Sequence, residues 1–164
     1  MKILYFGGQK SGKSKLAEAK ALELSHTQKP TYVATYDNSY GDKEMNERIK
    51  QHIEQRKKEF KTIEESFDLV RVIENNGTYL IDCISMWLLN TLSNPIEELF
   101  EQLELLEQKD ANIIFVLNNV NSGIIPLDKE SRAFVDRSGV IGQKLASFCD
   151  EVYEVKLGLP LKVK

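Results

Sequence analysis

The sequence predicts an α/β fold in three layers, with a mostly parallel central sheet. Two observations on its 164 residues indicate this class. Short apolar segments typical of buried strands alternate with helical patterns along the chain. Strands joined through helices require right-handed crossovers, which cover both faces of the sheet with helices. Because no repeat, low-complexity segment or linker rich in proline and glycine interrupts this order, we expect a single domain over residues 1–164.

The individual elements follow from local patterns. Strands are expected at 2–6, 31–35, 68–73, 78–83, 112–117 and 151–155. Helices are expected at 13–24, 85–92, 94–108 and over most of 131–148. The turn Asn75-Asn76-Gly77 separates two of the strands. At the start of the helix over 94–108, Asn94 can serve as the N-cap and Pro95 suits the first helical position.

The composition is that of an ordinary globular protein, with 41% hydrophobic residues, 29% charged residues and a formal net charge of -3. No apolar run approaches the roughly 18–20 residues that span a bilayer, and the segment MKILYFGG is too short for a signal peptide. Near-balanced charge disfavours a nucleic-acid partner. Cys83 and Cys149 lie far apart, which excludes a disulfide framework and a CxxC zinc site. We therefore expect a cytoplasmic protein with two free thiols.

A phosphate-binding motif follows the first expected strand. Residues 7–14, GGQKSGKS, match G-x-x-x-x-G-K-[ST] in the strand-to-helix context that this motif requires. Lys13 is expected to reach the β- and γ-phosphates of a nucleoside triphosphate, and the Ser14 hydroxyl to ligate Mg²⁺. The expected nucleotide-binding residues are Gly7, Gly8, Gln9, Lys10, Ser11, Gly12, Lys13 and Ser14. The alternative is a glycine-rich turn that only connects strand to helix, which the complete motif disfavours.

Asp82 is the candidate for a second acidic residue of the nucleotide site. It closes the apolar run YLID, where such a residue holds the hydration shell of Mg²⁺. It could instead cap the helix expected at 85–92, but the phosphate-binding motif favours the Mg²⁺ role. The carboxyl ends of parallel strands would bring Gly7, Asp82 and Asn118 to one edge of the sheet, where such folds bind ligands.

Residues 42–60 read as an amphipathic helix that carries one histidine. Glu44, Arg48, His52 and Arg56 recur every four residues and share one face. Spacing alone favours a solvated face with ion pairs. The other interpretation makes His52 a nucleophile, because Arg48 and Arg56 would favour its neutral form and bind phosphates. His26 lies at a helix end and is expected to be a cap or a surface residue.

Several segments together resemble one known family. GGQKSGKS, TYVATYD, DKEMNERIKQHIEQR, TIEE, YLIDCISMWLLN, GIIP, SRAFVDRSG and GLPLKVK occur in the order found in the bifunctional adenosylcobinamide kinase / adenosylcobinamide-phosphate guanylyltransferases of cobalamin synthesis. The resemblance covers essentially the whole chain. Its most specific parts are the pattern E-M-x-x-R-I-x-x-H-x-x-x-R and the pattern D-C-x-x-x-W-x-x-N.

The resemblance implies a RecA-like P-loop domain, a homotrimer, Mg²⁺, and ATP and GTP as substrates. It implies phosphorylation of adenosylcobinamide, then attack of a histidine on GTP and transfer of GMP to give adenosyl-GDP-cobinamide. The guanylylated histidine of the family matches His52 through Arg48 and Ile49. Asp82 and Cys83 match its second acidic motif, and Glu64 matches a glutamate placed near the guanine nucleotide.

The chain departs from the family pattern at a few positions. Where the family usually reads N-E-V-G before x-G-I-V-P, residues 118–126 read NNVNSGIIP, so Asn119 replaces a glutamate and Asn121 a glycine. Gly142 stands where the family favours asparagine, and Phe60 where it has tryptophan. An amide cannot act as a general base or as a charged Mg²⁺ ligand. Three alternatives therefore stay open: a homologue that has lost one half-reaction, a P-loop kinase of another small substrate with a structural His52, and a nucleotide-gated binding module.

Overall fold

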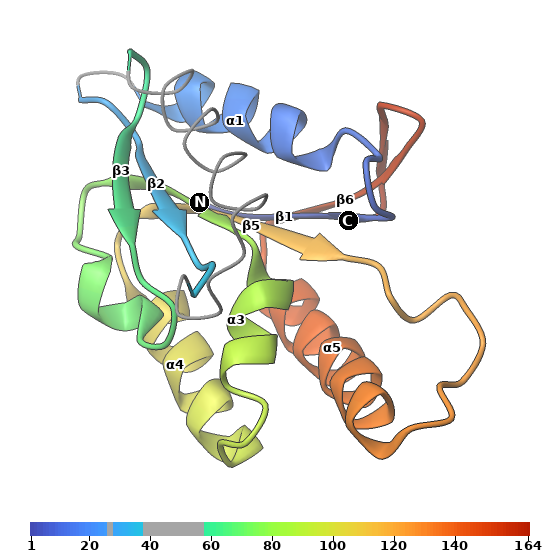
Figure 1. The fold of residues 1–164 in the computed structure, drawn as a ribbon. Helices are drawn as coiled ribbons and strands as arrows, with labels where there is room; N and C mark the ends of the chain where they lie inside the picture. The colour runs from blue at the N-terminus through green and yellow to red at the C-terminus, as the bar shows by residue number, and fades with distance from the viewer. Residues whose placement is uncertain (26–27, 38–57) are drawn as a thin grey trace.

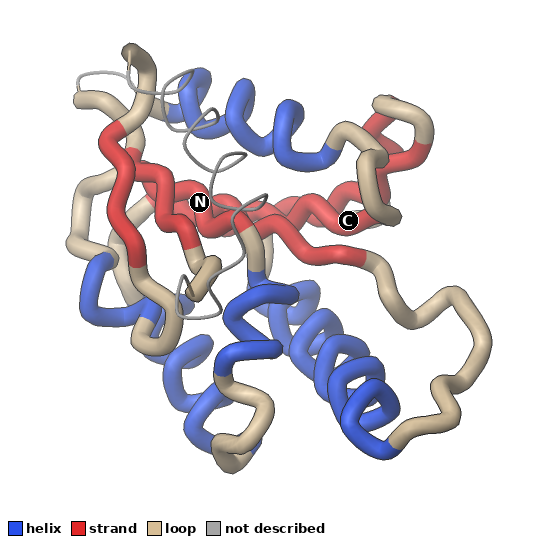
Figure 2. The backbone as a smooth tube through the Cα atoms, in the orientation of Figure 1, coloured by secondary structure: helices blue, strands red, loops and turns tan. Residues whose placement is uncertain are grey.

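The structure is a computed structural model that describes residues 1–25, 28–37 and 58–164. It contains a seven-stranded sheet with the order β3-β2-β4-β5-β1-β6-β7 (Figures 1 and 2). The strands are β1 (Lys2–Gly7), β2 (Thr31–Ala34), β3 (Lys61–Glu64), β4 (Thr78–Asp82), β5 (Asn112–Asn118), β6 (Glu151–Lys156) and β7 (Leu159–Lys162). Neighbouring strands pair in parallel, except that β7 runs antiparallel to β6.

Helices cover both faces of this sheet. Figure 1 shows α1 (Lys13–Leu24) on one face, with α3 (Ile84–Asn90), α4 (Ile96–Gln108) and α5 (Lys129–Phe148) on the other. The expected α/β class with a mostly parallel sheet is confirmed, and the bounds expected for the first helix coincide with those of α1. The first strand extends one residue further than expected, to Gly7.

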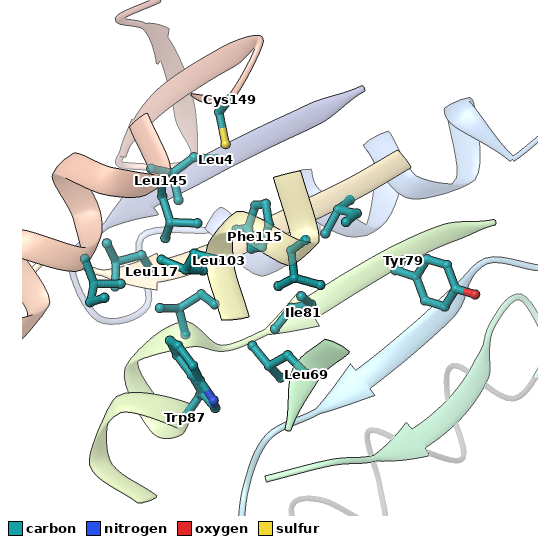
Figure 3. Close-up of a cluster of buried hydrophobic side chains, with 14 of the residues drawn as sticks. Leu4, Leu69, Tyr79, Ile81, Trp87, Leu103, Phe115, Leu117, Leu145 and Cys149 are labelled. Atoms are coloured by element: carbon teal, nitrogen blue, oxygen red, sulfur yellow. The ribbon is translucent and has the colours of Figure 1, made fainter. Parts of the chain in front are cut away.

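The core is divided by the sheet into two layers. On the face of α3, α4 and α5, buried side chains from strands and helices pack together, including Leu4, Trp87, Leu103 and Phe115 (Figure 3). On the face of α1, a second cluster packs around Ala17 and Ala21. Strand β5 contributes to both layers, because its successive side chains point to opposite faces. Ile113, Phe115 and Leu117 lie in one cluster, and Ile114 and Val116 in the other.

The strand expected at 68–73 is not formed. Leu69–Val72 is instead a short 3₁₀ helix, η2, which follows Asp68. The side chain of Asp68 accepts a hydrogen bond from the backbone N–H of Arg71. Leu69 and Ile73, four positions apart, are both buried in the cluster that includes α4. Within the described sheet, β4 has β2 and β5 as its neighbours, so a strand at 68–73 has no place beside it.

Two described strands were not expected from the sequence. β3 is four residues long and pairs with β2 at one edge of the sheet. β7 pairs with β6 through a two-residue turn, Leu157-Gly158, in which both residues have positive φ, 54° and 80°. Such a turn produces a tight hairpin, and Pro160 is compatible with the edge position of β7. The glycine at position 158 was the feature of the sequence that could have predicted this hairpin.

The expected cap of the helix after Asn94 is wrong by one residue. α4 begins at Ile96 with Pro95 in the cap position. The Nδ2 of Asn94 donates to the carboxylate of Glu98 at 3.1 Å, so the Asn94 side chain bonds to another side chain and not to the backbone N–H groups of the helix.

In the helix expected at 42–60, Lys58 and Glu59 form a turn, and Phe60 is buried and non-helical. The rest of that helix, like His26, lies outside the described residues.

Candidate active site

The carboxyl ends of the central strands form the edge that the sequence analysis expected to bind ligands. In the register of the sheet, Gly7 of β1 lies beside Asn118 of β5, and Asp82 of β4 lies beside Val116. The backbone N–H of Asn119 donates to the carbonyl of Gly7 at 2.8 Å, which joins the loop after β5 to the start of the phosphate loop. The three residues expected at this edge, Gly7, Asp82 and Asn118, are therefore together.

The phosphate loop, residues 7–14, has a conformation that depends on two of its glycines. A Cβ at Gly7 would lie 2.5 Å from the carbonyl oxygen of Val155. Gly12 has φ 97°, and a Cβ there would lie 3.1 Å from the Cα of Gly158. Figure 1 shows this loop beside the β6–β7 turn, and the N–H of Gly158 donates to the carbonyl of Ser11 at 2.8 Å. Contact with the hairpin thus supports the loop from outside.

Lys13 is the central cation of the loop. It is the first residue of α1 and only 7% exposed, and its Nζ donates to the carbonyl of Gly8 at 3.1 Å. Burial lowers the pKa of Lys13, while the negative charge of Asp82 and, to a lesser degree, Cys83 oppose that shift. A buried ammonium group is suited to bind phosphate oxygens, because little water competes for it.

Asp82 is oriented by a residue from the neighbouring strand. The hydroxyl of Tyr32, on β2, donates to Oδ2 of Asp82 at 2.9 Å. α3 begins after Cys83, and no side-chain hydrogen bond caps it from the described residues. The alternative in which Asp82 caps this helix is therefore not what the structure shows. Tyr32 was missed by the sequence analysis, because nothing in the segment TYVA signals a partner 50 positions away.

The residue after Asp82 is fixed from two sides. The Thr35 hydroxyl accepts from the N–H of Cys83 at 2.9 Å and donates to its carbonyl at 2.8 Å. The Nδ2 of Asn118 lies 3.8 Å from the Cys83 Sγ. Burial, and then the charge of Asp82, raise the pKa of this thiol to about 11. A raised pKa keeps the thiol neutral near pH 7, which disfavours a role as nucleophile.

Ser14 and Asp82 are the residues expected to hold Mg²⁺. Ser14 lies in the first turn of α1, next to Lys13, and Asp82 ends β4 close enough to raise the Lys13 pKa. Hydroxyl and carboxylate oxygens are the ligands that Mg²⁺ prefers, with phosphate oxygens and water completing its coordination. The donor set therefore fits this ion.

The other expected site residues divide into two groups. Glu64 ends β3 and has an exposed side chain. In the register of the sheet, Ala34 of β2 pairs with Glu64 on one side and with Asp82 on the other, so Glu64 lies at the same carboxyl end of the sheet as Asp82. His52, Arg48 and Arg56 lie outside the described residues.

Three of the four positions that depart from the family pattern lie in one place. Asn119, Asn121 and Gly142 all line a cavity of about 340 Å³ between the sheet and α5. The Nδ2 of Asn121 donates to the carbonyl of Val135 on α5 at 2.8 Å, and the Oδ1 of Asn119 accepts from the N–H of Asn121 at 3.2 Å. These side chains join the loop after β5 to α5. Phe60 lies elsewhere, with its ring 6.2 Å from that of Tyr32, edge to face.

A family model, described as cobinamide kinase / cobinamide phosphate guanyltransferase, matches residues 3–163. The chain belongs to this family. Among curated relatives, the bifunctional adenosylcobalamin biosynthesis protein CobP of Pseudomonas aeruginosa is 35% identical over 173 residues, covering 100% of this chain and 98% of the relative. The proteins named CobU of Escherichia coli and Salmonella typhimurium, with the same description, are each 30% identical over 186 residues, covering 100% of both chains.

Membership of this family confirms the resemblance stated above. The chain is an enzyme of the cobinamide kinase and guanyltransferase family, within cobalamin biosynthesis, and its phosphate loop belongs to a P-loop fold. In the described part of the chain, no helix is both long and apolar enough to cross a membrane.

Proposed function

We propose that this chain carries out both reactions, phosphorylation of adenosylcobinamide and transfer of GMP from GTP to the product. The observation that supports this most directly is the buried Lys13 of a complete phosphate loop, with Asp82 at the carboxyl end of a central strand. ATP or GTP is the phosphoryl donor, and GTP is the guanylyl donor. The chain acts as one domain, in the cytoplasm, as a homotrimer.

In the first reaction, the loop residues position the triphosphate for attack by the substrate hydroxyl. The N–H groups of the loop and the Lys13 ammonium bind the β- and γ-phosphates and stabilise charge that develops during transfer. Ser14 and Asp82 hold Mg²⁺, which when bound supplies further positive charge to the phosphates. The oxygen of the hydroxyl bonds to the γ-phosphorus, the bond to the β-phosphate oxygen breaks, and the hydroxyl proton is released.

In the second reaction, His52 is the nucleophile. Its neutral imidazole nitrogen bonds to the α-phosphorus of GTP, pyrophosphate leaves, and a GMP-histidine forms. A phosphate oxygen of cobinamide phosphate then bonds to the same phosphorus, and the bond to the histidine nitrogen breaks. Arg48 and Arg56 favour the neutral imidazole and stabilise the phosphates, and Glu64 lies near the guanine.

Mapping of the covalent adduct tests this proposal. The protein is incubated with GTP labelled in the α-phosphate and Mg²⁺, and the modified residue is identified by mass spectrometry. We expect GMP on His52. The His52→Ala variant should form no adduct and no GDP-cobinamide, yet should still phosphorylate adenosylcobinamide, because that step needs no enzyme nucleophile.

His26→Ala is the matched control, since the chain contains two histidines. It should form the adduct at the rate of the wild type. An adduct that persists in His52→Ala would refute the assignment of the nucleophile. A wild type that phosphorylates adenosylcobinamide without forming any adduct would be a simple kinase, and one that neither phosphorylates nor guanylylates it would be a binding module.

A further inference from the structure

The cavity between the sheet and α5 is lined by none of the phosphate-loop residues 7–14. Its volume is about 340 Å³, and its walls are mainly apolar, with Phe6, Leu117 and Val152 on the sheet side and Gly142 and Ala146 on the helix side. It lies on the α5 face of the sheet, whereas α1 continues from the phosphate loop on the opposite face. Binding cavities for small molecules have volumes of roughly 300–1,000 Å³, with apolar walls and a few polar groups.

One wall of the cavity is shared with the phosphate loop. Asn119 lines this cavity and also a second one that is lined by Gly8, Gln9, Lys10 and Ser11. Its backbone N–H donates to the carbonyl of Gly7. Asn119 therefore connects a wall of this cavity to the start of the phosphate loop.

A buried polar residue is among those that line the cavity. Ser138 of α5 is 1% exposed and lines the cavity. Its Oγ has no hydrogen-bond partner among the residues that the structure describes. A buried hydroxyl without a partner lowers stability, so a ligand group that bonds to it would gain binding free energy.

We propose that this cavity is a subsite for the acceptor, cobinamide, and this inference rests on the proposed function. The corrin ring carries methyl groups and amide side chains at its edge, which match an apolar wall with a free hydroxyl. The cavity receives part of that edge, and Ser138 bonds to an amide of it. The apolar walls offer few partners to the base and ribose of a nucleotide, and Asn119 connects the cavity to the start of the phosphate loop.

Three variants test the subsite. Ala146→Leu fills the cavity from α5, and Ser138→Ala removes the hydroxyl without adding volume. Ser147→Leu is the control for the first variant, because Ser147 is the next residue of α5 and is exposed. Binding of cobinamide is measured by equilibrium dialysis from its visible absorbance, and nucleotide binding and thermal unfolding are measured on the same samples.

We expect Ala146→Leu to weaken cobinamide binding by about tenfold or more, with nucleotide binding unchanged within about twofold and Ser147→Leu like the wild type. Ser138→Ala should weaken cobinamide binding by roughly threefold to tenfold while the ligand-free protein keeps or raises its melting temperature. A hydroxyl with a purely structural role would lower that temperature and leave binding unchanged.

Other outcomes would overturn the subsite. If the wild type binds cobinamide and Ala146→Leu binds it equally well, the acceptor lies elsewhere while the proposed function stands. If Ala146→Leu alters the mass in sedimentation, the cavity is covered by a second copy of the chain. If the wild type binds no cobinamide at all, the proposed function fails and the subsite fails with it.

Discussion

Tyr32 and Asp82 meet across two strands through a hydrogen bond of 2.9 Å, which holds one carboxylate oxygen in place at the edge of the sheet. A carboxylate that serves as a Mg²⁺ ligand must be oriented, and partners of the ligand supply that orientation. Tyr32 is buried and packs against Phe60, so its ring remains in place when the hydroxyl is removed. The hydroxyl is thus a positioning group for Asp82.

Tyr32→Phe should raise the Mg²⁺ concentration needed for half-maximal activity several-fold, while stability changes by about 1 kcal/mol. The measurement is the rate of adenosylcobinamide phosphorylation as a function of Mg²⁺ concentration. Tyr79→Phe is the matched control, because the Tyr79 hydroxyl accepts from the N–H of Glu74 at 3.0 Å and Tyr79 is the second residue of β4, away from Asp82 at its carboxyl end. Equal Mg²⁺ dependence in the two variants would contradict a positioning role.

Lys13→Met should abolish phosphoryl transfer without loss of stability. The substitution keeps an unbranched chain in the buried position but removes the charge that stabilises the transferred phosphate, which should raise the barrier by several kcal/mol. Because burial lowers the Lys13 pKa, the charge of Lys13 costs folding free energy, so its removal should not destabilise the fold. Chemical denaturation and phosphorylation assays measure the two effects. Activity near that of the wild type would show that the phosphate loop is wrongly assigned.

At the scale of elements, the phosphate loop and the β6–β7 hairpin form one unit. The hairpin turn donates a hydrogen bond to Ser11 and lies against Gly12, so the last two strands contribute to a site that begins at residue 7. Gly7 and Gly12 are the loop glycines that lie against the hairpin. A side chain at either position would come too close to Val155 or Gly158.

Gly12→Ala and Gly8→Ala should differ in stability. At Gly12, an alanine would adopt φ 97° and contact Gly158, which should destabilise the fold by about 1–2 kcal/mol. At Gly8, a Cβ meets no described atom within 4 Å, so stability should stay within about 0.5 kcal/mol of the wild type. Urea unfolding of both variants measures the difference. Equal stabilities would show that the hairpin does not constrain the loop.

At the scale of the whole molecule, the sheet connects two core layers that share β5. Each layer contains one buried free cysteine, Cys83 on the α1 face and Cys149 on the α5 face. Burial raises the pKa of these thiols to about 11 and about 12, so both are neutral near pH 8 in the folded protein. A layer that unfolds exposes its thiol.

Both thiols should react with a thiol reagent at pH 8 in a single urea transition, and neither should react rapidly before it. This outcome is expected if the chain is one cooperative domain, because neither layer is stable without the shared sheet. The measurement is the number of labelled cysteines at each urea concentration, resolved by peptide mapping. Separate transitions for Cys83 and Cys149 would show that the two layers unfold independently.

Several parts of this molecule were determined by the sequence itself. The bounds of α1 and the position of β5 follow from patterns that repeat within about a dozen residues, because helical and strand periodicities are local properties. The phosphate loop is equally local, since eight consecutive residues supply its glycines, its lysine and its serine. Asp82 was found because it follows an apolar strand, and its alignment with Gly7 follows from the parallel topology.

Only the tertiary structure decided which distant surfaces meet. The apolar segment at 68–73 suits a strand or a helical turn, and it became η2 because Leu69 and Ile73 pack beside α4 and no strand position was open next to β4. The Tyr32–Asp82 bond, the support of the phosphate loop by the β6–β7 turn and the cavity beside Ser138 join residues that local patterns do not connect. Such contacts depend on the free energy of packing the complete chain, which no short window of residues contains.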